Sequence, residues 1–350
     1  MYVLIGILLL GILIAVHEFG HFIAARLCGI EVMEFAIGMG PKIFGWTGKS
    51  GTKLSLRCIP LGGFCAFYGE DDVEGKSKDD PRAYGKQNVW KRIFTVAMGP
   101  MMNFVLALVV SIAVYTFMAM PIYEPMITEI VAESPAAQAG LQPGDVITAV
   151  DGVNVLDGTT TALSNAIGNI DGVQEHRLTV RREGETFEAV ASTYWDEAEQ
   201  KYRIGITFMG NVVGSYRLSF GEAVQEGWGY CVDAGTAVFD ALKGLVTDPA
   251  IRDQVAGPVG TVQVVSQAVK QDGAIAFFSL LVMISVNLGI MNLLPIPGLD
   301  GSRIVFHLIE AVRGKPIKPE REALVHFIGM IFLFGLMIFF TFKDVLRIFS

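Results

Sequence analysis

Two common features are missing from this sequence, and each absence speaks against a class of protein. It has four cysteines, and no two of them are spaced as Cys-x-x-Cys, which argues against a structural zinc site built from thiolates. The net charge is −8 and no run of Lys or Arg occurs, so the composition does not favour a nucleic-acid partner. The cysteines are Cys28, Cys58, Cys65 and Cys231.

The start of the chain also lacks the marks of a cleaved signal peptide. No basic residue precedes the apolar run, and Met1–Val16 has no small-x-small cleavage site. We therefore expect this run to be a retained membrane span. Hydrophobic residues make up 52% of the 350 residues and the mean hydropathy is +0.47. This composition fits several spans combined with a soluble module.

Four apolar runs are long enough to cross a membrane. We expect the second helix to be interrupted early, at Gly99-Pro100, because proline lacks the N–H that a helix interior needs. The third run ends at Pro295. The four predicted spans cover residues 2–27, 93–120, 274–294 and 324–342.

The distribution of Lys and Arg predicts how these spans are oriented. Residues 26–92 hold 11 of the 27 basic residues, and the short segment 301–322 holds five more. Residues 120–276 hold nine basic residues against 21 acidic ones. The positive-inside rule therefore places 28–92 and 301–322 in the cytoplasm, with both termini and the region 121–273 outside.

The most informative motif is His17-Glu18-Phe19-Gly20-His21, because it lies inside the first apolar run. An ionisable group within hydrocarbon costs about 2.5–3.5 kcal/mol on insertion scales, so such groups usually serve a function. Residues i and i+4 share a helix face, so both imidazoles can bind one Zn²⁺. Glu18 follows the first of them and can act as a general base toward water.

A catalytic zinc site needs a third protein ligand. Asp300 is the only carboxylate between Asp272 and Glu310, and it follows the third span after two helix-breaking prolines. It is our candidate, with His307 and His326 as competitors that we expect to be interfacial or packing residues. Asn292 is a candidate donor to a substrate carbonyl or oxyanion, and the alternative for it is a cap or a packing amide near the helix break.

A second apolar segment lies between the first two spans. Lys53–Ile59 alternates in polarity and meets Pro60-Leu61-Gly62-Gly63, which predicts a β-hairpin over 53–68 with a Gly-Gly turn. We expect it to re-enter the membrane near the zinc, where it could hold an extended peptide by adding a strand to it. A surface hairpin is the alternative.

The region after the second span predicts a small α+β domain, followed by one amphipathic segment. Expected strands cover 126–131, 146–150, 177–181, 186–192 and 203–208, with helices at 134–141 and 159–167. Residues 216–246 recur at helical spacing, and we expect a helix lying in the membrane interface. A fifth span is the alternative.

These motifs together resemble the site-2 protease family of intramembrane zinc metalloproteases, in particular its bacterial branch that cleaves membrane-anchored anti-sigma factors. The resemblance covers nearly the whole chain. It is carried by four blocks: His17–His21, Pro60-Leu61-Gly62-Gly63, Gly99-Pro100-Met101-Met102-Asn103-Phe104 and Asn287–Gly301.

The resemblance implies roles for single residues. His17, His21 and Asp300 would be the zinc ligands and Glu18 the catalytic base. The residues that position the substrate would be Asn292, Pro297, Gly62 and Gly63. Residues 122–210 would form one PDZ domain, unlike relatives with two, and its peptide-binding loop would contain Ile204, Gly205 and Ile206.

The implied protein is a multi-pass enzyme of the bacterial cytoplasmic (inner) membrane. Its fold class is membrane α-helical, with four transmembrane helices, a re-entrant β-hairpin and one extracytoplasmic α+β PDZ domain. Residues 1–121 would hold the first two spans, the zinc motif and the hairpin, and the PDZ domain would follow. Residues 211–273 would form an interfacial helix and loop, and residues 274–350 would hold the last two spans and the third zinc ligand. Its partners would be the lipid bilayer and single-span substrates, either anti-sigma factors or signal-peptide remnants. The sequence gives no oligomeric state. The alternatives are a membrane PDZ scaffold and a metal-ion transporter with a non-proteolytic zinc site.

Overall fold

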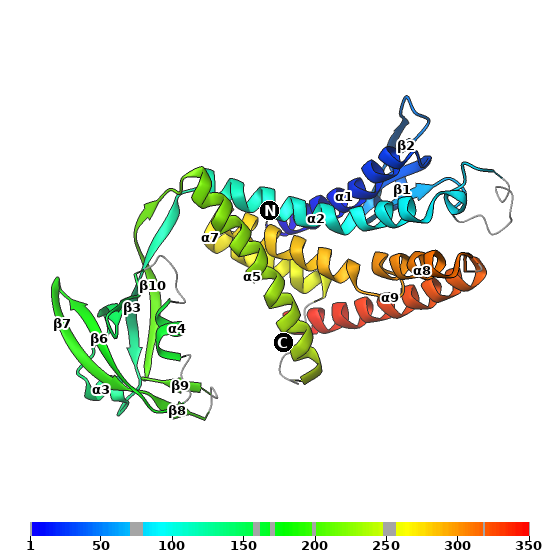
Figure 1. Cartoon of the computed structure of the whole chain (residues 1–350). Coiled ribbons are helices and arrows are strands. Elements are labelled where there is room, and N and C mark those ends of the chain that lie inside the picture. The colour runs from blue at the N-terminus through cyan, green and yellow to red at the C-terminus, as the bar shows by residue number, and fades with distance from the viewer. Residues whose placement is uncertain are drawn as a thin grey trace. The chain divides into compact units, whose positions relative to one another are not determined.

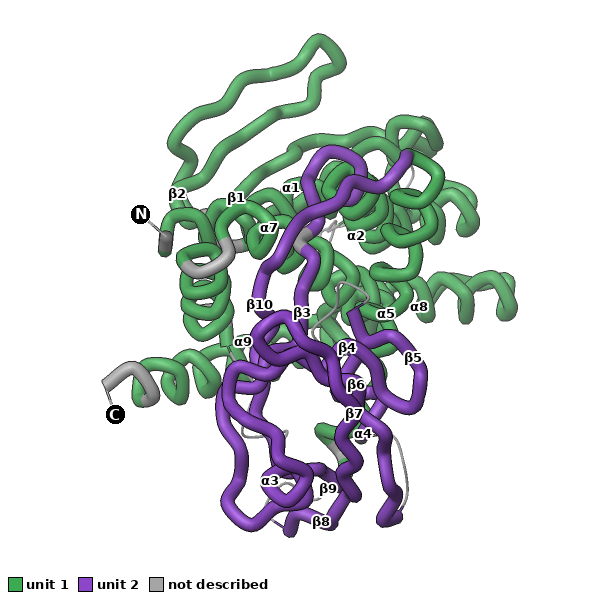
Figure 2. Tube along the Cα trace, turned by 90° about the vertical axis from the view of Figure 1, so that its left-hand side faces the viewer, with its two compact units in different colours: residues 1–114, 220–350 green, residues 115–219 purple. Residues whose placement is uncertain are grey.

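The computed structural model describes residues 2–70, 80–156, 162–168, 172–197, 201–247, 257–317 and 319–349. The chain divides into two compact units, which Figure 2 colours separately. Unit 1 combines Met1–Val114 with Phe220–Ser350, and unit 2 is Tyr115–Ser219. Unit 1 is therefore built from two parts of the chain that are far apart in sequence.

Helices dominate unit 1 (Figure 1). The described part of the chain contains four helices that are long and apolar enough to cross a membrane, which confirms the expected number. The elements of unit 1 are α1 (Tyr2–Cys28), β1 (Val32–Thr47), β2 (Lys53–Phe67), the 3₁₀ helix η1 (Tyr84–Lys86), α2 (Val89–Phe117), α5 (Phe220–Thr247), α7 (Pro258–Leu293), α8 (Asp300–Arg313) and α9 (Pro319–Phe349). The candidate spans are Val3–Cys28, Val89–Phe117, Gly273–Leu293 and Glu320–Leu346.

Two of the apolar helices differ from their prediction. The expected interruption at Gly99-Pro100 is wrong, because α2 continues through Pro100 from Val89 to Phe117. The proline removes one backbone donor, and the rest of a 29-residue apolar helix keeps its hydrogen bonds. The helix α7 begins well before residue 274 and bends at Gly273, whose φ of 63° is non-helical.

Packing between distant helices closes the core of unit 1. Leu9 and Leu13 of α1 are fully buried against Val265 and Leu281 of α7. At the start of α7, the Asp344 carboxylate of α9 accepts hydrogen bonds from the N–H groups of Gly257 and Gly260, at 3.2 and 2.7 Å. The first N–H groups of a helix have no hydrogen-bond partner within that helix, so the carboxylate caps the start of α7.

The amphipathic segment after unit 2 forms the helix α5. Its buried Ala234 packs with Ala107 of α2 and with Val282 and Val286 of α7. It is not among the four candidate spans of the described chain. Its position in the membrane interface stays a prediction.

The two long strands β1 and β2 form a sheet with an unexpected order. Trp46 pairs with Leu54, as in a simple hairpin whose turn follows Thr47. Phe35, however, pairs with both Leu54 and Cys65. The first half of β1 therefore lies between the two halves of β2.

The predicted Gly-Gly hairpin over 53–68 is thus wrong in its pairing. The segments on either side of Gly62-Gly63 are extended as expected, but β1 separates them. The sequence pattern does not predict β1, because this segment contains three glycines and a proline, residues that weaken a strand pattern.

In its described residues, unit 2 contains a six-stranded sheet, a two-stranded sheet and two short helices. The strand order is β10-β3-β4-β6-β7, with β5 paired to β4, and β8 pairs separately with β9. The strands are β3 (Met120–Ile130), β4 (Val146–Val150), β5 (Val153–Asn154), β6 (Glu175–Arg182), β7 (Glu185–Ser192), β8 (Tyr194–Asp196), β9 (Lys201–Arg203) and β10 (Ile206–Tyr216), and the helices are α3 (Pro135–Gln138) and α4 (Ala162–Gly168).

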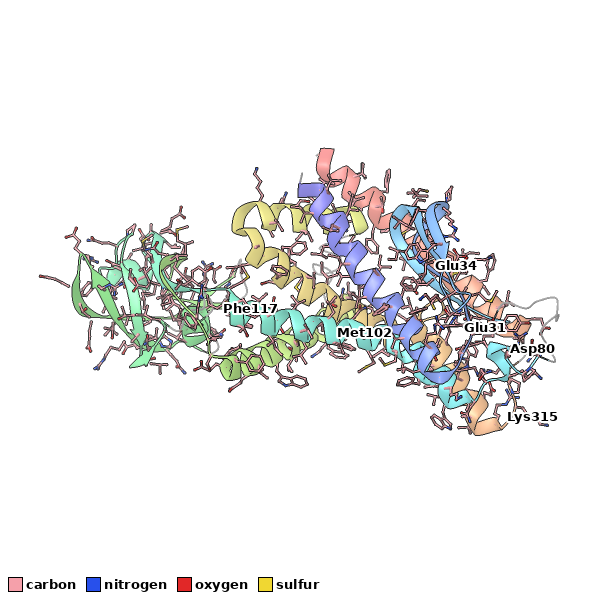
Figure 3. All side chains as sticks on the ribbon, turned by 90° about the horizontal axis from the view of Figure 1, so that it is seen from above. Glu31, Glu34, Asp80, Met102, Phe117 and Lys315 are labelled. Carbon is pink, nitrogen blue, oxygen red and sulfur yellow. The ribbon has the colours of Figure 1, made fainter. Side chains whose placement is uncertain are left out.

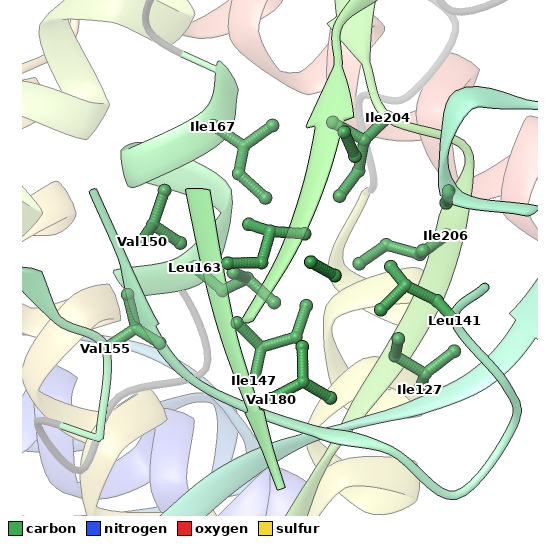
Figure 4. Close-up of a cluster of buried hydrophobic side chains, with 14 residues drawn as sticks. Ile127, Leu141, Ile147, Val150, Val155, Leu163, Ile167, Val180, Ile204 and Ile206 are labelled. Atoms are coloured by element: carbon green, nitrogen blue, oxygen red, sulfur yellow. The ribbon is translucent and has the colours of Figure 1, made fainter. Parts of the chain in front are cut away.

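Alternating apolar residues of these strands build the core of unit 2 (Figure 4). Ile147, Leu178 and Val180 are fully buried there. The strand expected at 203–208 is wrong in its extent, because the chain turns at Gly205, where φ is +90°. One strand ends before this turn and β10 begins after it. The part of the predicted helix at 159–161 lies outside the described residues.

Candidate metal centre

Three predicted ligand residues converge in unit 1. His17 and His21 lie one turn apart on α1, and their Nε2 atoms are 3.2 Å apart. Oδ2 of Asp300 lies 3.0 Å from Nε2 of His17 and 3.4 Å from Nε2 of His21. The side chains of His17 and Asp300 are 12% and 18% exposed. The site is therefore mostly enclosed by protein, and its two histidines lie within the candidate span Val3–Cys28.

A tight turn between α7 and α8 places Asp300. The helix α7 ends at Leu293, and Asp300 is the first residue of α8. A β-carbon on Gly301 would overlap the carbonyl oxygens of Leu293 and Leu294, so only glycine fits there. The Asp-Gly sequence therefore lets the carboxylate follow closely behind the end of the third span.

The donor set fits a divalent metal. Oδ2 of Asp300 is buried and has no hydrogen bond to the residues that the structure describes. Oδ2 faces the two imidazole nitrogens without a well-formed hydrogen bond to either, and a cation between the three atoms would satisfy all of them. Two imidazole nitrogens and one carboxylate oxygen within 4.8 Å of one another are a ligand set for catalytic zinc, with a fourth position left for water or substrate.

The face of α2 next to α1 contacts both imidazoles. Nδ1 of His21 lies 3.0 Å from the carbonyl oxygen of Thr95, which accepts its hydrogen bond. Nδ1 of His17 lies 3.3 Å from Nδ2 of Asn103. Sequence reasoning gave Thr95 and Asn103 no role, although their eight-residue spacing places them on one helix face.

The helices α1 and α2 approach closely at this site. A β-carbon on Gly20 would overlap the carbonyl oxygen of Met98 and touch the side chain of Met102, which Figure 3 labels on α2. Gly20 lies between Glu18 and His21, within the predicted motif. The second variable position of this motif therefore serves helix packing.

Glu18 of α1 lies beside the β-sheet. A β-carbon on Gly63 would lie 2.9 Å from Cγ of Glu18. Gly63 belongs to β2, so the sheet reaches the candidate base directly. Gly62 has a φ of +93° and packs on the Met39 side chain.

The other predicted substrate residues lie around the α7–α8 turn. Asn292 is half-buried at the end of α7. Pro297 contacts α9, where a β-carbon on Gly329 would overlap its carbonyl oxygen. The N–H of Gly298 donates to Nδ1 of His326, at 3.4 Å. His326 thus holds the turn and, as expected, lies outside the metal cluster of the described residues.

His307 also has a packing role, as expected. Its Nε2 lies 3.2 Å from the Tyr84 hydroxyl, and its Nδ1 lies 3.5 Å from a guanidinium nitrogen of Arg92. Burial, together with the positive charges of Arg92 and Arg303, lowers the pKa of His307 to about 3, so the ring is neutral. Arg92 in turn pairs with Glu310 of α8.

The predicted peptide-binding loop of unit 2 is placed before β10. The side chains of Ile204 and Ile206 are 2% and 8% exposed and belong to the core of unit 2. Gly205 between them packs against Ser134. The side chains of Ile204 and Ile206 therefore pack into the domain, and the carbonyl oxygens of Ile204 and Gly205 accept hydrogen bonds from Ala136 and Val131.

Two imidazoles and a carboxylate, enclosed among apolar helices of membrane-spanning length, define a membrane-embedded metal-dependent enzyme. The chain matches the model of Peptidase family M50 over residues 5–336, and it belongs to this family. It is a membrane metalloprotease whose metal is Zn²⁺.

The relatives agree over almost their full length. A protein of Agrobacterium fabrum named as a zinc metalloprotease is 34% identical, with 98% of this chain and 95% of the relative covered. The regulator of sigma-W protease RasP of Bacillus subtilis is 32% identical, with 98% of each chain covered. A PDZ domain of an SdrC-like protein from Listeria monocytogenes is 19% identical, covers 24% of this chain and 86% of its own, and has a TM-score of 0.22, a similarity that carries no argument about the fold.

Proposed function

We propose that this chain cleaves peptide bonds within or near the membrane segments of single-span proteins, with His17, His21 and Asp300 as zinc ligands and Glu18 as the base. The observation that supports this best is the convergence of three ligand atoms, one of which is a buried carboxylate oxygen with no hydrogen bond to the described residues. A site of this kind among apolar helices favours substrates that are themselves in the membrane.

The mechanism follows from the positions of these side chains. The chemistry that Zn²⁺ supplies when bound is Lewis acidity toward water and toward the peptide carbonyl. Glu18 takes a proton from the attacking water and passes it to the leaving amine nitrogen. Asn292, half-buried at the end of α7, is our candidate donor to the substrate carbonyl oxygen.

The β1–β2 sheet is proposed to hold the substrate in extended form. A helical membrane segment keeps its carbonyls in hydrogen bonds, so it must unwind locally before it is cleaved. Within the described residues, the stretch Gly63–Ala66 of β2 pairs with β1 on one side only. Gly63 also lies beside Glu18. A peptide added along this edge would pass the candidate base.

We propose further that unit 2 is an extracytoplasmic PDZ domain and that the enzyme lies in the bacterial inner membrane. The excess of Lys and Arg in 26–92 and 301–322 supports this orientation. Labelling a cysteine introduced at Glu129 with a membrane-impermeant reagent, in intact spheroplasts, tests it. Protection of that cysteine would overturn the proposed orientation.

The name of the Bacillus relative, regulator of sigma-W protease, supports anti-sigma factors as one substrate class for this chain. Signal-peptide remnants are the other proposed class. Comparing membrane proteomes of cells that carry the native chain or Glu18→Gln distinguishes them, because uncleaved single-span fragments accumulate in the variant. If the two proteomes are identical, neither class is a substrate.

The test of the chemistry uses purified protein in liposomes with a single-span test substrate. Glu18→Gln should bind zinc as the native chain does and lose cleavage by at least about 100-fold, because it removes the general base. Glu226→Gln, an exposed carboxylate on α5, is the matched control and should cleave normally. Normal cleavage by Glu18→Gln would exclude Glu18 as the base. Zinc flux into the same liposomes without cleavage would favour the transporter alternative.

A further inference from the structure

Asn103 has one polar atom that the fold leaves without a partner. Its side chain is completely buried on α2, and its backbone carbonyl accepts a hydrogen bond from the Ser285 hydroxyl at 2.8 Å. Nδ2 faces Nδ1 of His17 at 3.3 Å, whereas Oδ1 has no hydrogen bond to any described residue. Such an oxygen in a buried amide calls for an explanation.

Metal binding by His17 determines whether the Asn103 amide must donate or accept the hydrogen bond. Nε2 of His17 points at His21 and Asp300, so the ring would bind the metal through Nε2. A neutral imidazole that binds through Nε2 carries its proton on Nδ1 and needs an acceptor there. The amide nitrogen is a donor, so two donors would face each other. A 180° rotation of the amide group exchanges the two atoms at no cost in shape.

We propose that Asn103 is a positioning residue of the metal site, whose Oδ1 accepts the hydrogen bond from Nδ1 of His17 when the metal is bound. This inference rests on the proposed ligation by His17. The amide fixes the orientation of the ring and the position of its proton, so that the lone pair of Nε2 is directed at the metal.

The second imidazole has the same arrangement. The carbonyl oxygen of Thr95 accepts from Nδ1 of His21 at 3.0 Å. Thr95, Gly99 and Asn103 follow one another at four-residue spacing, so they lie on one face of α2. Gly99, between the two acceptors, lies directly against the rings. One helix face thus gives each imidazole an acceptor and leaves room for both.

The test measures zinc affinity of the full chain in detergent, by competition with a chelator. Asn103→Leu should weaken Zn²⁺ binding about 10- to 100-fold, the range for loss of an outer-shell partner. Asn103→Asp should stay within a few-fold of the native chain, because a carboxylate also accepts the hydrogen bond. The absorption spectrum of the Co²⁺-loaded chain should change in Asn103→Leu and stay native-like in Asn103→Asp.

Ser111→Ala is the matched control. Ser111 is also buried on α2, and its hydroxyl donates to the carbonyl of Gly227 at 3.1 Å, away from the metal ligands. This variant should bind zinc with native affinity. If Asn103→Leu does not fold, judged by the melting temperature of the metal-free chain, Asn103→Ala carries the same expectation.

Three outcomes overturn the proposal. The first is native zinc affinity in both Asn103→Leu and Asn103→Ala. The second is an equal loss in Asn103→Leu and Asn103→Asp, because the acceptor would then have no effect. The third is native zinc affinity in His17→Ala, because His17 would then not be a zinc ligand. A native chain that binds zinc but does not cleave peptides would overturn the proposed function and leave the role of Asn103 standing.

Discussion

Gly99 of α2 lies so close to His21 of α1 that a β-carbon on the glycine would overlap Nε2 and Cε1 of the imidazole. The same β-carbon would lie 3.0 Å from Cε1 of His17. The absence of a side chain at position 99 therefore decides whether both rings can turn toward Asp300. Gly99 is as specific a part of this site as the histidines, although it contributes no ligand atom.

Gly99→Ala should displace the two rings and lower zinc affinity at least about 10-fold, the lower range for losing support of a ligand. Zinc content after dialysis against a weak chelator measures this. Gly11→Ala is the matched control, because no heavy atom lies within 4 Å of the position a β-carbon would take on Gly11 of α1. It should bind zinc normally. Native zinc content in Gly99→Ala would show that α1 and α2 can move apart without loss of zinc affinity.

The ion pair between Arg303 and Glu70 should stabilise the position of α8. Nη1 of Arg303, one turn after Asp300, donates to Oε1 of Glu70 at 2.5 Å, and the Glu70 side chain is 13% exposed. Glu70→Gln should lower the free energy of unfolding by about 1–3 kcal/mol, because it weakens the partner of a charged group. Thermal unfolding of the detergent-solubilised chain measures this.

The double variant Glu70→Gln with Arg303→Met separates the pair from its surroundings. If the two side chains act together, their combined loss should be smaller than the sum of the single losses, with a coupling of about 0.5–3 kcal/mol. Strict additivity would contradict a direct interaction. Arg177→Met, whose guanidinium lies 3.8 Å from Glu188 on the exposed surface of unit 2, should change stability by less than about 0.5 kcal/mol.

Unit 2 should lose stability in acid through Asp145. Burial opposes ionisation of Asp145, but the Arg182 guanidinium, at 2.6 Å, and the N–H of Gln142 outweigh it and lower the pKa of the carboxyl below its usual range. Because the folded state holds this proton less tightly than the unfolded state, the stabilisation is complete above the unfolded pKa of about 4 and is lost as the pH falls below it.

Asp145→Asn should remove this part of the acid dependence and cost about 1–3 kcal/mol at neutral pH, because Arg182 loses its charged partner. Amide hydrogen exchange of residues 141–150 and 177–182 in the full chain, at a series of pH values corrected for intrinsic exchange, measures both effects. Asp151, whose pKa is also lowered by the N–H of Arg177 and by His176, should keep a smaller acid dependence in the variant. An unchanged pH profile would exclude Asp145 as a source.

Gly205 should tolerate no side chain. Its φ of +90° is strained for other residues, and a β-carbon would overlap the side chain of Ser134. Gly205→Ala should therefore destabilise unit 2 by about 2–5 kcal/mol, from backbone strain and overpacking together. Limited proteolysis at a series of urea concentrations detects this.

Gly184→Ala provides the matched control. Gly184 has a nearly equal φ of +91°, but no heavy atom lies within 4 Å of the position a β-carbon would take. Gly184→Ala should lower the stability of unit 2 only by the backbone strain, about 1–3 kcal/mol. Equal effects of the two variants would show that the contact with Ser134 has no weight.

Local patterns predicted much of this chain, because they depend on short stretches of sequence. The four apolar runs appear as helices since their length and composition suffice for a span. His17 and His21 share a helix face because of their spacing alone. Asp300 is predictable as a ligand because it is the only carboxylate between Asp272 and Glu310, at the end of the third apolar run.

The errors arose where contacts from distant segments decide the outcome. The order of the β1–β2 sheet depends on pairing between Phe35, Leu54 and Cys65, which no local pattern encodes. The break expected at Pro100 did not occur in the structure, where α2 continues as one long apolar helix. The strand expected at 203–208 overlooked the turn that Gly205 makes against Ser134.

By itself the sequence determined which residues can bind a metal, which segments are apolar enough for a membrane, and where glycine and proline restrict the backbone. Only the tertiary structure decided that Thr95, Gly99 and Asn103 of α2 surround the imidazoles and that Gly63 lies beside Glu18. The physical reason is range. Hydrophobicity and helical spacing act over a few residues, whereas the support of a buried ligand depends on which distant helix packs against it.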